Sequence, residues 1–350
     1  MGVFAMKLWD KIISGPGVFV IAEAGVNHNG DIRQAKGLVD AAVLAGADAV
    51  KFQTFRTDKL VTTRAPKAVY QEMDGMPGEP QAVMLRRLEL SFPQFEELKS
   101  YCETQRIFFI STPFDEESAD FLSGLGMPFF KISSGELTNV SLLARVAGKG
   151  LPVILSTGMS NLDDIAGALD ILRKNGCGQI LLLHCVSNYP VAYQDVNLQA
   201  MKTLSERFNL PVGLSDHTLG IEIPIAAAAL GACVLEKHFT LDKTAPGPDH
   251  QASLDPHELR AMVRAVRHVG LAMGNGIKEV VRCEENVRQV ARRSLVAARD
   301  IGAGELLEAG HMTCKRPGTG MPPSLLPAMV GKKSKVFIPA DTLIMPEMLA

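Results

Sequence analysis

The chain has 350 residues, of which 47% are hydrophobic, and a formal net charge of -2 at pH 7. This balance gives no reason to expect a nucleic acid or an anionic membrane as a partner, and no apolar stretch reaches the roughly 18 residues of a membrane span. The first 17 residues lack the apolar core of a signal peptide, and the six cysteines form no CxxC pair. We therefore expect a cytoplasmic protein with free thiols.

Eight short apolar runs each end in polar or ionisable side chains. They begin near residues 19, 48, 107, 128, 152, 180, 211 and 233. Such near-continuous runs are typical of buried parallel strands. Segments with helical spacing lie between them, at residues 31–44, 92–105, 162–174 and 255–272. The alternation predicts an α/β fold, a (β/α)8 TIM barrel with its active site at the C-terminal ends of the strands.

Two further features mark individual segments. Pro256 directly after Asp255 indicates the start of a helix. The longest interval between predicted strands follows Thr54 and contains a Gly/Pro-rich piece from Asp74 to Pro80. Long loops in compact domains are usually functional, so we predict an active-site loop with an extra helix there.

The character of the sequence changes near Gly274-Asn275-Gly276. A charged helix is predicted from Glu284 to Gln289, and short β-like pieces broken by Gly and Pro follow it. These roughly 60 residues are near the lower limit for an independent domain. We predict a catalytic barrel at residues 1–275, a linker at 276–290 and a small β-rich domain at 291–350.

Two histidines, His217 and His238, follow the seventh and eighth predicted strands, which are neighbours in a barrel. Two imidazoles that converge there can bind one divalent metal ion and leave positions for water and substrate oxygens. They can equally form a hydrogen-bonded pair at the strand ends. The spacing alone leaves both interpretations open.

Cationic and hydroxyl side chains share the same end of the predicted barrel. Lys51 and Lys131 both follow apolar runs, and the hydroxyl groups are those of Ser111, Thr112, Ser134, Ser156 and Ser215. Two ammonium groups within a ring of hydroxyls suit a phosphate or a carboxylate, although a lone lysine at a strand end more often reaches solvent. The set favours an anionic substrate.

Three acidic residues are candidates for chemistry. Glu23 ends the first predicted strand, where a carboxylate acts as a general acid or base, holds a substrate hydroxyl, or pairs with Lys51. Glu136 and Asp249 stand in turn-rich segments and are as well suited to bracing a loop as to binding a substrate. No P-loop or GxGxxG frame is present.

Nine short motifs follow one another along the chain. They occupy residues 22–30, 50–54, 111–115, 131–136, 155–159, 183–185, 188–190, 215–218 and 236–240. Together they resemble the sialic acid synthase family, which includes N-acetylneuraminate synthases and their legionaminate and pseudaminate relatives. The tail, with Ala291-Arg292-Arg293-Ser294 and Lys315-Arg316-Pro317-Gly318, resembles the C-terminal SAF (antifreeze-like) domain of that family.

The resemblance implies a transferase that condenses phosphoenolpyruvate with N-acetylmannosamine or a related N-acyl hexosamine, releasing phosphate and forming a nine-carbon 2-keto acid. It implies a divalent metal ion, usually Mn²⁺ with Mg²⁺ or Co²⁺ as alternatives, held by His217 and His238. It also implies a domain-swapped homodimer, in which the SAF domain of one subunit caps the barrel of the other and Arg316 reaches the N-acyl group.

The same resemblance implies the roles of the remaining site residues. Phosphoenolpyruvate would be bound by Lys51, Thr112, Lys131, Ser134, Ser156, Asn188 and Ser215. The sugar would be placed by Glu23, Gln53, Tyr189 and Asp249, with Glu23, Lys51 and Lys131 taking part in catalysis. We expect the choice of sugar to reside in the loop from Asp58 to Pro80.

Several functions remain open at this point. We favour an N-acetylneuraminate synthase, and the alternative is an N,N'-diacetyllegionaminate or pseudaminate synthase, including members labelled as spore-coat polysaccharide proteins. A keto-deoxy-octulosonate-type or heptulosonate-type synthase is disfavoured because those barrels lack a SAF domain. An inactive sugar-binding protein is disfavoured because every expected metal and phosphoenolpyruvate position carries a competent side chain.

Overall fold

The computed structural model describes residues 8–13, 15, 17–74 and 78–350. The chain divides into two compact units, Met1–Gly274 and Asn275–Ala350.

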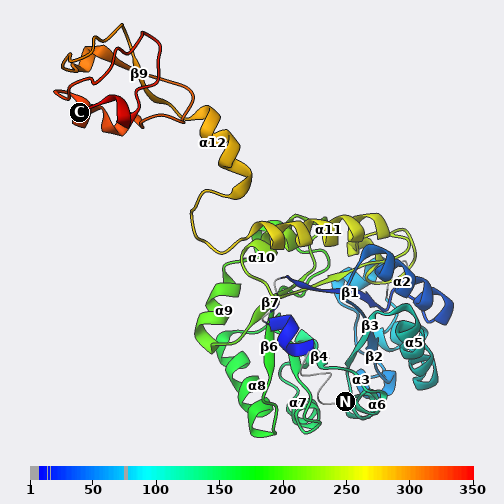
Figure 1. Cartoon of the computed structure of the whole chain (residues 1–350). Coiled ribbons are helices and arrows are strands. Elements are labelled where there is room, and N and C mark those ends of the chain that lie inside the picture. Colours follow the sequence, from blue (N-terminus) through cyan, green and yellow to red (C-terminus); the bar gives the residue numbers. More distant parts are fainter. Residues whose placement is uncertain (1–7, 14, 16, 75–77) are drawn as a thin grey trace. The chain divides into compact units, whose positions relative to one another are not determined.

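Eight parallel strands form the sheet of the first unit. Their bounds are β1 Phe19–Gly25, β2 Ala49–Thr54, β3 Phe108–Pro113, β4 Phe130–Ile132, β5 Val153–Ser156, β6 Ile180–Cys185, β7 Val212–Asp216 and β8 Val234–His238. The strand order is β3-β2-β1-β8-β7-β6-β5-β4. Because β3 and β4 also contact each other, the sheet closes into a barrel (Figure 1). The predicted TIM barrel is confirmed.

Helices follow the strands and cover the outside of the barrel (Figure 1). They are α2 Ile32–Ala45, α5 Phe92–Gln105, α6 Glu116–Leu125, α7 Val140–Ala147, α8 Leu162–Lys174, α9 Ala200–Phe208, α10 Glu222–Ala229 and α11 Pro256–Ala272. At the start of α11, Asp255 accepts from the backbone N–H of Glu258, whose carboxylate accepts from the N–H of Asp255. This capping box confirms the helix start predicted at Pro256.

The interval between β2 and α5 holds short helices, where an extra helix was predicted; residues 75–77 of the Gly/Pro-rich piece lie outside the described residues. They are α3 Thr57–Leu60, the 3₁₀ turn η1 Val69–Asp74 and α4 Gln81–Leu88. Glu89 accepts hydrogen bonds from the backbone N–H and the hydroxyl of Thr57, at 2.9 and 2.6 Å. These bonds fasten the first turn of the insertion to its last residues.

Side chains alternate across each strand of the barrel. In β1, Phe19 and Ile21 belong to an apolar cluster inside the barrel, whereas Val20 and Ala22 belong to the core beneath the helices. Trp9 closes the inner cluster at the amino-terminal end, with its ring centroid 6.3 Å from that of Phe129. The inside of the barrel is therefore filled by apolar side chains towards the amino-terminal ends of the strands, and polar side chains occupy it at the carboxyl-terminal ends.

The second unit is small and turn-rich. Strands β9 Ser294–Ala297 and β10 Met312–Lys315 pair antiparallel. Its helices are α12 Glu285–Ala291 and α13 Leu326–Met329. Apolar residues including Leu295, Ile301 and Ile338 form a separate buried core. This unit thus has its own core, as an independent domain requires.

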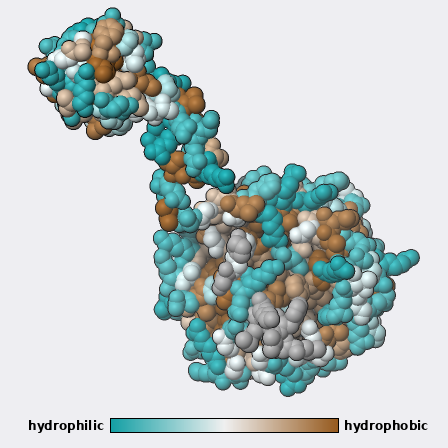
Figure 2. All heavy atoms as spheres, in the orientation of Figure 1, coloured by the Kyte–Doolittle hydropathy of each residue, from teal (hydrophilic) through white to brown (hydrophobic). Residues whose placement is uncertain are grey.

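Single 3₁₀ turns complete the secondary structure. They are η2 Ser134–Glu136, η3 Tyr193–Asp195, η4 His250–Ala252, η5 Arg282–Glu284, η6 Ala309–His311, η7 Pro323–Leu325 and η8 Pro346–Met348. In the view of Figure 2, hydrophilic residues cover much of the surface of both units. Among the residues that the structure describes, no helix combines the length and apolarity needed to cross a membrane.

Candidate active site

A pocket of about 440 Å³ lies at the carboxyl-terminal ends of the barrel strands. Its floor is built by strand residues whose side chains point into the barrel. A polar residue stands two positions beyond a packed inner residue such as Ile21, Ala49 or Phe129. The polar residues at this spacing are Glu23, Lys51, Thr112, Lys131, Ser156 and Glu236, and Ser215 and His238 line the same pocket. The alternation of the strands therefore brings side chains from distant segments into one buried site.

Two lysines and two carboxylates form a buried ionic cluster at the bottom of this pocket. The ammonium of Lys51 lies 2.9 Å from Glu23 and 3.7 Å from Glu236. Lys131 lies 3.4 Å from Glu236, which also accepts a hydrogen bond of 3.1 Å from the Ser215 hydroxyl. Glu236 thus holds both ammonium groups from one side.

Burial and neighbouring charges shift the pKa values of the two carboxyl groups in opposite directions. Burial raises the pKa of Glu23 to about 7, although Lys51 opposes this shift. Burial alone would also raise the pKa of Glu236, but the ammonium groups of Lys131 and Lys51 outweigh it and lower that pKa. Glu23 can therefore exchange a proton near neutral pH, while Glu236 stays ionised.

Hydroxyl groups crowd around the lysines. Thr112 accepts a hydrogen bond of 3.1 Å from Lys51, and Ser134 accepts one of 2.9 Å from the backbone N–H of Gly158. A Cβ at Gly158 would lie 2.3 Å from the hydroxyl of Ser187 and 2.8 Å from that of Ser134, so only glycine permits this approach. Within the described residues, the buried hydroxyl of Ser156 has no hydrogen-bond partner, which leaves it available to a ligand.

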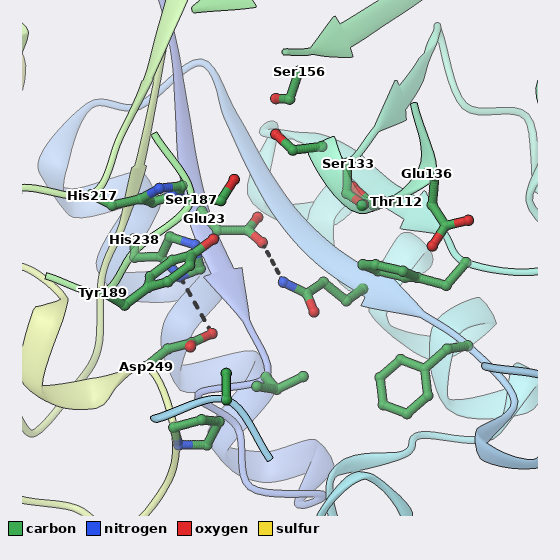
Figure 3. A pocket seen from close by; sticks show the side chains of 18 of the residues that line it. Glu23, Thr112, Ser133, Glu136, Ser156, Ser187, Tyr189, His217, His238 and Asp249 are labelled. Carbon is green, nitrogen blue, oxygen red and sulfur yellow. Dashed lines mark hydrogen bonds and ion pairs between the residues drawn. The ribbon is translucent and has the colours of Figure 1, made fainter. Parts of the chain in front are cut away.

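Imidazole rings occupy the side of the pocket opposite Glu136 (Figure 3). The ring centroids of His217 and His238 are 5.4 Å apart. The ring of Tyr189 lies 4.0 Å from His217 and 5.4 Å from His238, measured between centroids. The two histidines from neighbouring strands thus converge on one side of the pocket.

The hydrogen bonding of the two rings suits a metal ion. Nδ1 of His217 bonds the Val186 carbonyl at 2.8 Å, which leaves its other nitrogen for a ligand. Nδ1 of His238 is buried 3.6 Å from Asp249 and has no hydrogen-bond partner among the described side chains and backbone. Burial, assisted by the charge of His217, lowers the pKa of His238 well below its usual value, so this ring is neutral, the form that binds metal. Burial also acts to lower the pKa of His217, but the charge of Cys185 outweighs it and raises that pKa, so a metal ion bound there would replace the proton of His217.

No cluster of three or more His, Cys, Asp and Glu side chains in the described part of the chain could hold a metal ion by itself. The two imidazoles would therefore need oxygen ligands from water or a substrate, as a metal ion in an open catalytic site has. The donor set fits a divalent ion bound by nitrogen and oxygen, such as Mn²⁺.

A loop brings Asp249 to the imidazole side of the pocket. The hydroxyl of Ser253 donates to the backbone carbonyl of Asp249 at 2.6 Å, and the side-chain amide of Asn27 donates to that hydroxyl at 2.9 Å. Burial raises the pKa of Asp249 to about 6. Gln53 reaches in from β2 and donates to Glu23 at 3.0 Å.

The structure brings most of the sequence-predicted site residues together. Those that line the pocket are Glu23, Lys51, Gln53, Thr112, Lys131, Ser134, Ser156, Tyr189, Ser215, His217, His238 and Asp249. Asn188 does not line it, since its amide is exposed and donates to the Pro190 carbonyl at 2.9 Å. Arg316 belongs to the second unit, where its Nε donates to the Ala291 carbonyl at 2.9 Å.

Sequence reasoning missed some lining residues. Glu236 was assigned no role, although it stands two residues before His238 on β8 and must face the same side. Ser187 lines the pocket where Asn188 does not. Tyr70 lies in the insertion, with its ring centroid 4.9 Å from that of Tyr189, and no sequence signal indicated this contact.

The comparisons with known proteins agree with this architecture. The NeuB family profile matches residues 38–278 and the SAF domain profile matches residues 292–350. The chain is 47% identical to the N,N'-diacetyllegionaminic acid synthase of Campylobacter jejuni, over 93% of this chain and 98% of that protein. It is 38% identical to the N-acetylneuraminate-9-phosphate synthase of Homo sapiens, over 95% and 92%.

A solved structure is similar along most of its length. The N-acetylneuraminic acid synthetase of Leptospira borgpetersenii, crystallised with citrate, aligns with a TM-score of 0.68 and 35% identity, covering 77% of this chain and 90% of that one. Family profiles, related sequences and barrel geometry thus lead to one conclusion: this chain belongs to the NeuB family and carries a C-terminal SAF domain.

Proposed function

We propose that this protein is a sialic-acid-type nonulosonate synthase, a transferase that joins phosphoenolpyruvate to an N-acyl hexosamine and releases phosphate. The observation that carries the proposal is the pairing of two buried lysines with available hydroxyls, directly beside two converging imidazoles. A small phosphorylated carboxylate and an aldehyde fit such a pair of subsites. The names of its relatives support the same class of reaction.

The lysines are proposed to bind phosphoenolpyruvate. Lys51 and Lys131 would balance the charges of its phosphate and carboxylate, and the hydroxyls of Thr112, Ser134 and Ser156 would donate to its oxygens. Burial lowers the pKa of Lys131, with Glu236 opposing that shift. An anionic substrate would raise this pKa again, so binding and protonation of Lys131 favour each other.

His217 and His238 are the residues that would hold a divalent metal ion; we propose Mn²⁺, with Mg²⁺ or Co²⁺ as alternatives. When bound, such an ion acts as a Lewis acid that polarises the aldehyde of the open-chain sugar. The ring of Tyr189 packs against that of His217, with the two ring planes tilted by 36°, and restricts the orientation of the imidazole. Asp249 faces His238 from the side of the sugar and would accept hydrogen bonds from sugar hydroxyls.

Glu23 is proposed to handle a proton during the condensation. Carbon 3 of phosphoenolpyruvate attacks the aldehyde, water adds at carbon 2, and the resulting tetrahedral species loses phosphate by C–O cleavage. A proton must reach the aldehyde oxygen and another must leave the attacking water. With a pKa near 7 and a hydrogen bond to Gln53, Glu23 is suited to one of these transfers.

An assay of phosphate release tests this function. We expect turnover when the protein is incubated with phosphoenolpyruvate, Mn²⁺ and members of a panel of N-acyl hexosamines that includes N-acetylmannosamine and a diacetamido-trideoxy hexose. Arabinose 5-phosphate serves as the comparison sugar, since an octulosonate-type synthase would accept it. Turnover with arabinose 5-phosphate alone would overturn the proposal. The ranking within the panel separates the N-acetylneuraminate and legionaminate alternatives.

We also propose that the active form is a homodimer in which the second unit of one subunit covers the barrel mouth of the other, with Arg316 reaching the N-acyl group. The arginine side chain is exposed in the second unit, as a residue that contacts another subunit would be. The six cysteines are free thiols, which fits the cytoplasmic location that we propose.

Intersubunit complementation tests the shared site. Arg316→Ala and His217→Ala are each expected to be nearly inactive, because one variant lacks the cap and the other lacks a pocket imidazole. When the two are co-expressed with different tags, half of randomly formed dimers are mixed and each has one intact site, so about a quarter of the wild-type activity should return. Purified mixed dimers with no more activity than the single variants would contradict the shared site.

A further inference from the structure

One wall of the pocket is apolar and distinct from the barrel core. It consists of the buried residues Val26, Phe55, Met84 and Leu88, with the partly buried Leu60, Leu85 and Phe114 packed against them. Every one of these side chains also lines the pocket. Because every member of this cluster lines the pocket, the cluster is suited to contact an apolar part of a ligand.

Most of this wall comes from the insertion between β2 and α5. Met84, Leu85 and Leu88 stand on α4 at spacings of one, three and four residues, so α4 turns one apolar face to the pocket. Leu60 ends α3. The insertion therefore shapes one side of the pocket, and the strand ends shape the floor.

The described residues that line the pocket include few cations. Among the described residues, the only lysine and arginine side chains that line the pocket are Lys51 and Lys131, and both belong to the ionic cluster on the floor. The segment from residue 73 to residue 77 contains neither lysine nor arginine in its sequence.

One carboxyl group lines the pocket outside the ionic cluster and away from Asp249. Glu136 lines the pocket on the side away from the imidazoles (Figure 3). Burial raises the pKa of Glu136, and Asp115 and Glu116 add to the shift, while only the amide of Asn139 lowers it. Three carboxyl groups thus influence one another here, and neither of the two lysines that line the pocket is among the groups that act on Glu136, so an added anion would find no cation to offset its charge.

We propose that the insertion selects an N-acyl hexosamine whose end remote from the aldehyde is uncharged and deoxygenated at carbon 6, and that it rejects a 6-phosphate. The inference rests on the proposed function, since the lysines and imidazoles must fix the phosphoenolpyruvate and the aldehyde. The rest of the sugar then extends away from the floor, and the apolar wall receives its far end. The wall residues Leu60, Met84, Leu85 and Leu88 are the specificity determinants.

The size of the discrimination follows from desolvation. A phosphate dianion placed against apolar side chains and Glu136 loses water without gaining a cation, which should lower kcat/KM on the order of 100-fold or more. A hydroxyl in place of hydrogen at carbon 6 costs less, about 10-fold, because apolar pockets reject an added hydroxyl only weakly. The expected order is therefore 6-deoxy sugar, free sugar, 6-phosphate.

The experiment compares three probes in the phosphate-release assay with the full-length protein: N-acetylmannosamine, its 6-deoxy derivative and its 6-phosphate. We expect kcat/KM to fall in the order given above. A 6-phosphate that reacts as well as the 6-deoxy sugar would overturn the inference while leaving the proposed function intact. No phosphate release with any N-acyl hexosamine would instead overturn the proposed function, and the inference with it.

A matched pair of variants on α4 tests the wall itself. Leu85→Lys places an ammonium on the pocket face, where the side chain is only partly buried and a long lysine can be accommodated. We expect it to raise the ratio of kcat/KM for the 6-phosphate to that for the 6-deoxy sugar at least about tenfold. Val83→Lys, on the exposed side of the same helix, should leave the ratio unchanged. An equal ratio in both variants would reject α4 as a specificity determinant.

Discussion

Replacing Glu236 by glutamine is expected to lower kcat/KM for phosphoenolpyruvate by about 100-fold or more, because it removes the anion between two buried ammonium groups. Glu236 lies 3.7 Å from Lys51 and 3.4 Å from Lys131. Without it, Glu23 alone would face two buried positive charges, and the nearer Lys51 would hold Glu23. Lys131 would then lose its proton more readily, and with it the attraction for phosphate.

The pH dependence gives this prediction a second readout. Burial already lowers the pKa of Lys131, and Glu236 is the first group that opposes the shift. In Glu236→Gln this pKa falls further, so the ammonium is lost at a lower pH than in the wild type. Affinity for phosphoenolpyruvate, measured by calorimetry across the pH range, should therefore decline earlier as pH rises.

A control separates this local effect from a general loss of stability. Asp48 accepts from Arg267 and from the backbone N–H of Val20, away from the pocket. Asp48→Asn also breaks an ion pair and should lower the free energy of unfolding without moving the pH profile of phosphoenolpyruvate binding. A Glu236→Gln protein whose profile matches that of Asp48→Asn would show that Glu236 only supports the fold.

The barrel could be predicted because buried strands and amphipathic helices leave strong periodic signals. The helices predicted at residues 92–105 and 162–174 are α5 and α8, since each begins at a capping residue and presents one apolar face. Where a strand ends in several polar residues, it was harder to predict which of their side chains face the inside of the barrel. The sequence places Glu236, Lys237 and His238 together, but Lys237 turns outward and pairs with Asp216 at 2.5 Å.

The same ambiguity affects the hydroxyl groups. Ser111 belongs to the predicted rim, yet it lies one residue before Thr112 and bonds to Thr54 at 2.7 Å outside the pocket. Counting in steps of two from the apolar inner residues Ala49, Ile110 and Val234 selects Lys51, Thr112 and Glu236. Once the apolar residues that face the inside of the barrel are known, this count identifies the pocket residues from the sequence.

The apolar wall could not be predicted, for a different reason. Met84, Leu85 and Leu88 look like the buried face of an ordinary short helix, and their spacing does not tell a core from a pocket wall. Their contacts with Val26, Phe55 and Phe114 depend on how the insertion folds back over the barrel. Tertiary placement, which leaves no local signal, decides such a surface.

Removing the His217 imidazole should abolish metal-dependent activity, with a fall in kcat/KM of about 1000-fold or more, since a Lewis acid contributes several kcal/mol to such a step. The ring centroids of His217 and His238 lie 5.4 Å apart. Because we propose only these two protein ligands, the loss of one would leave a single imidazole to hold the ion. His238→Ala should show a similar loss. The double variant should lose little more, because the two rings act as a unit.

Thermal unfolding supplies a readout that does not depend on turnover. Binding of Mn²⁺ to the folded state should raise the Tm of the wild type, and His217→Ala should lack this increase. His184→Gln is the matched control. That buried imidazole lies on β6, but it bonds the Val196 carbonyl at 2.6 Å and does not line the pocket. It should lower the Tm yet keep the increase with Mn²⁺. If His217→Ala keeps that increase as well, the metal ion binds elsewhere, and the two imidazoles must be assigned to substrate binding alone.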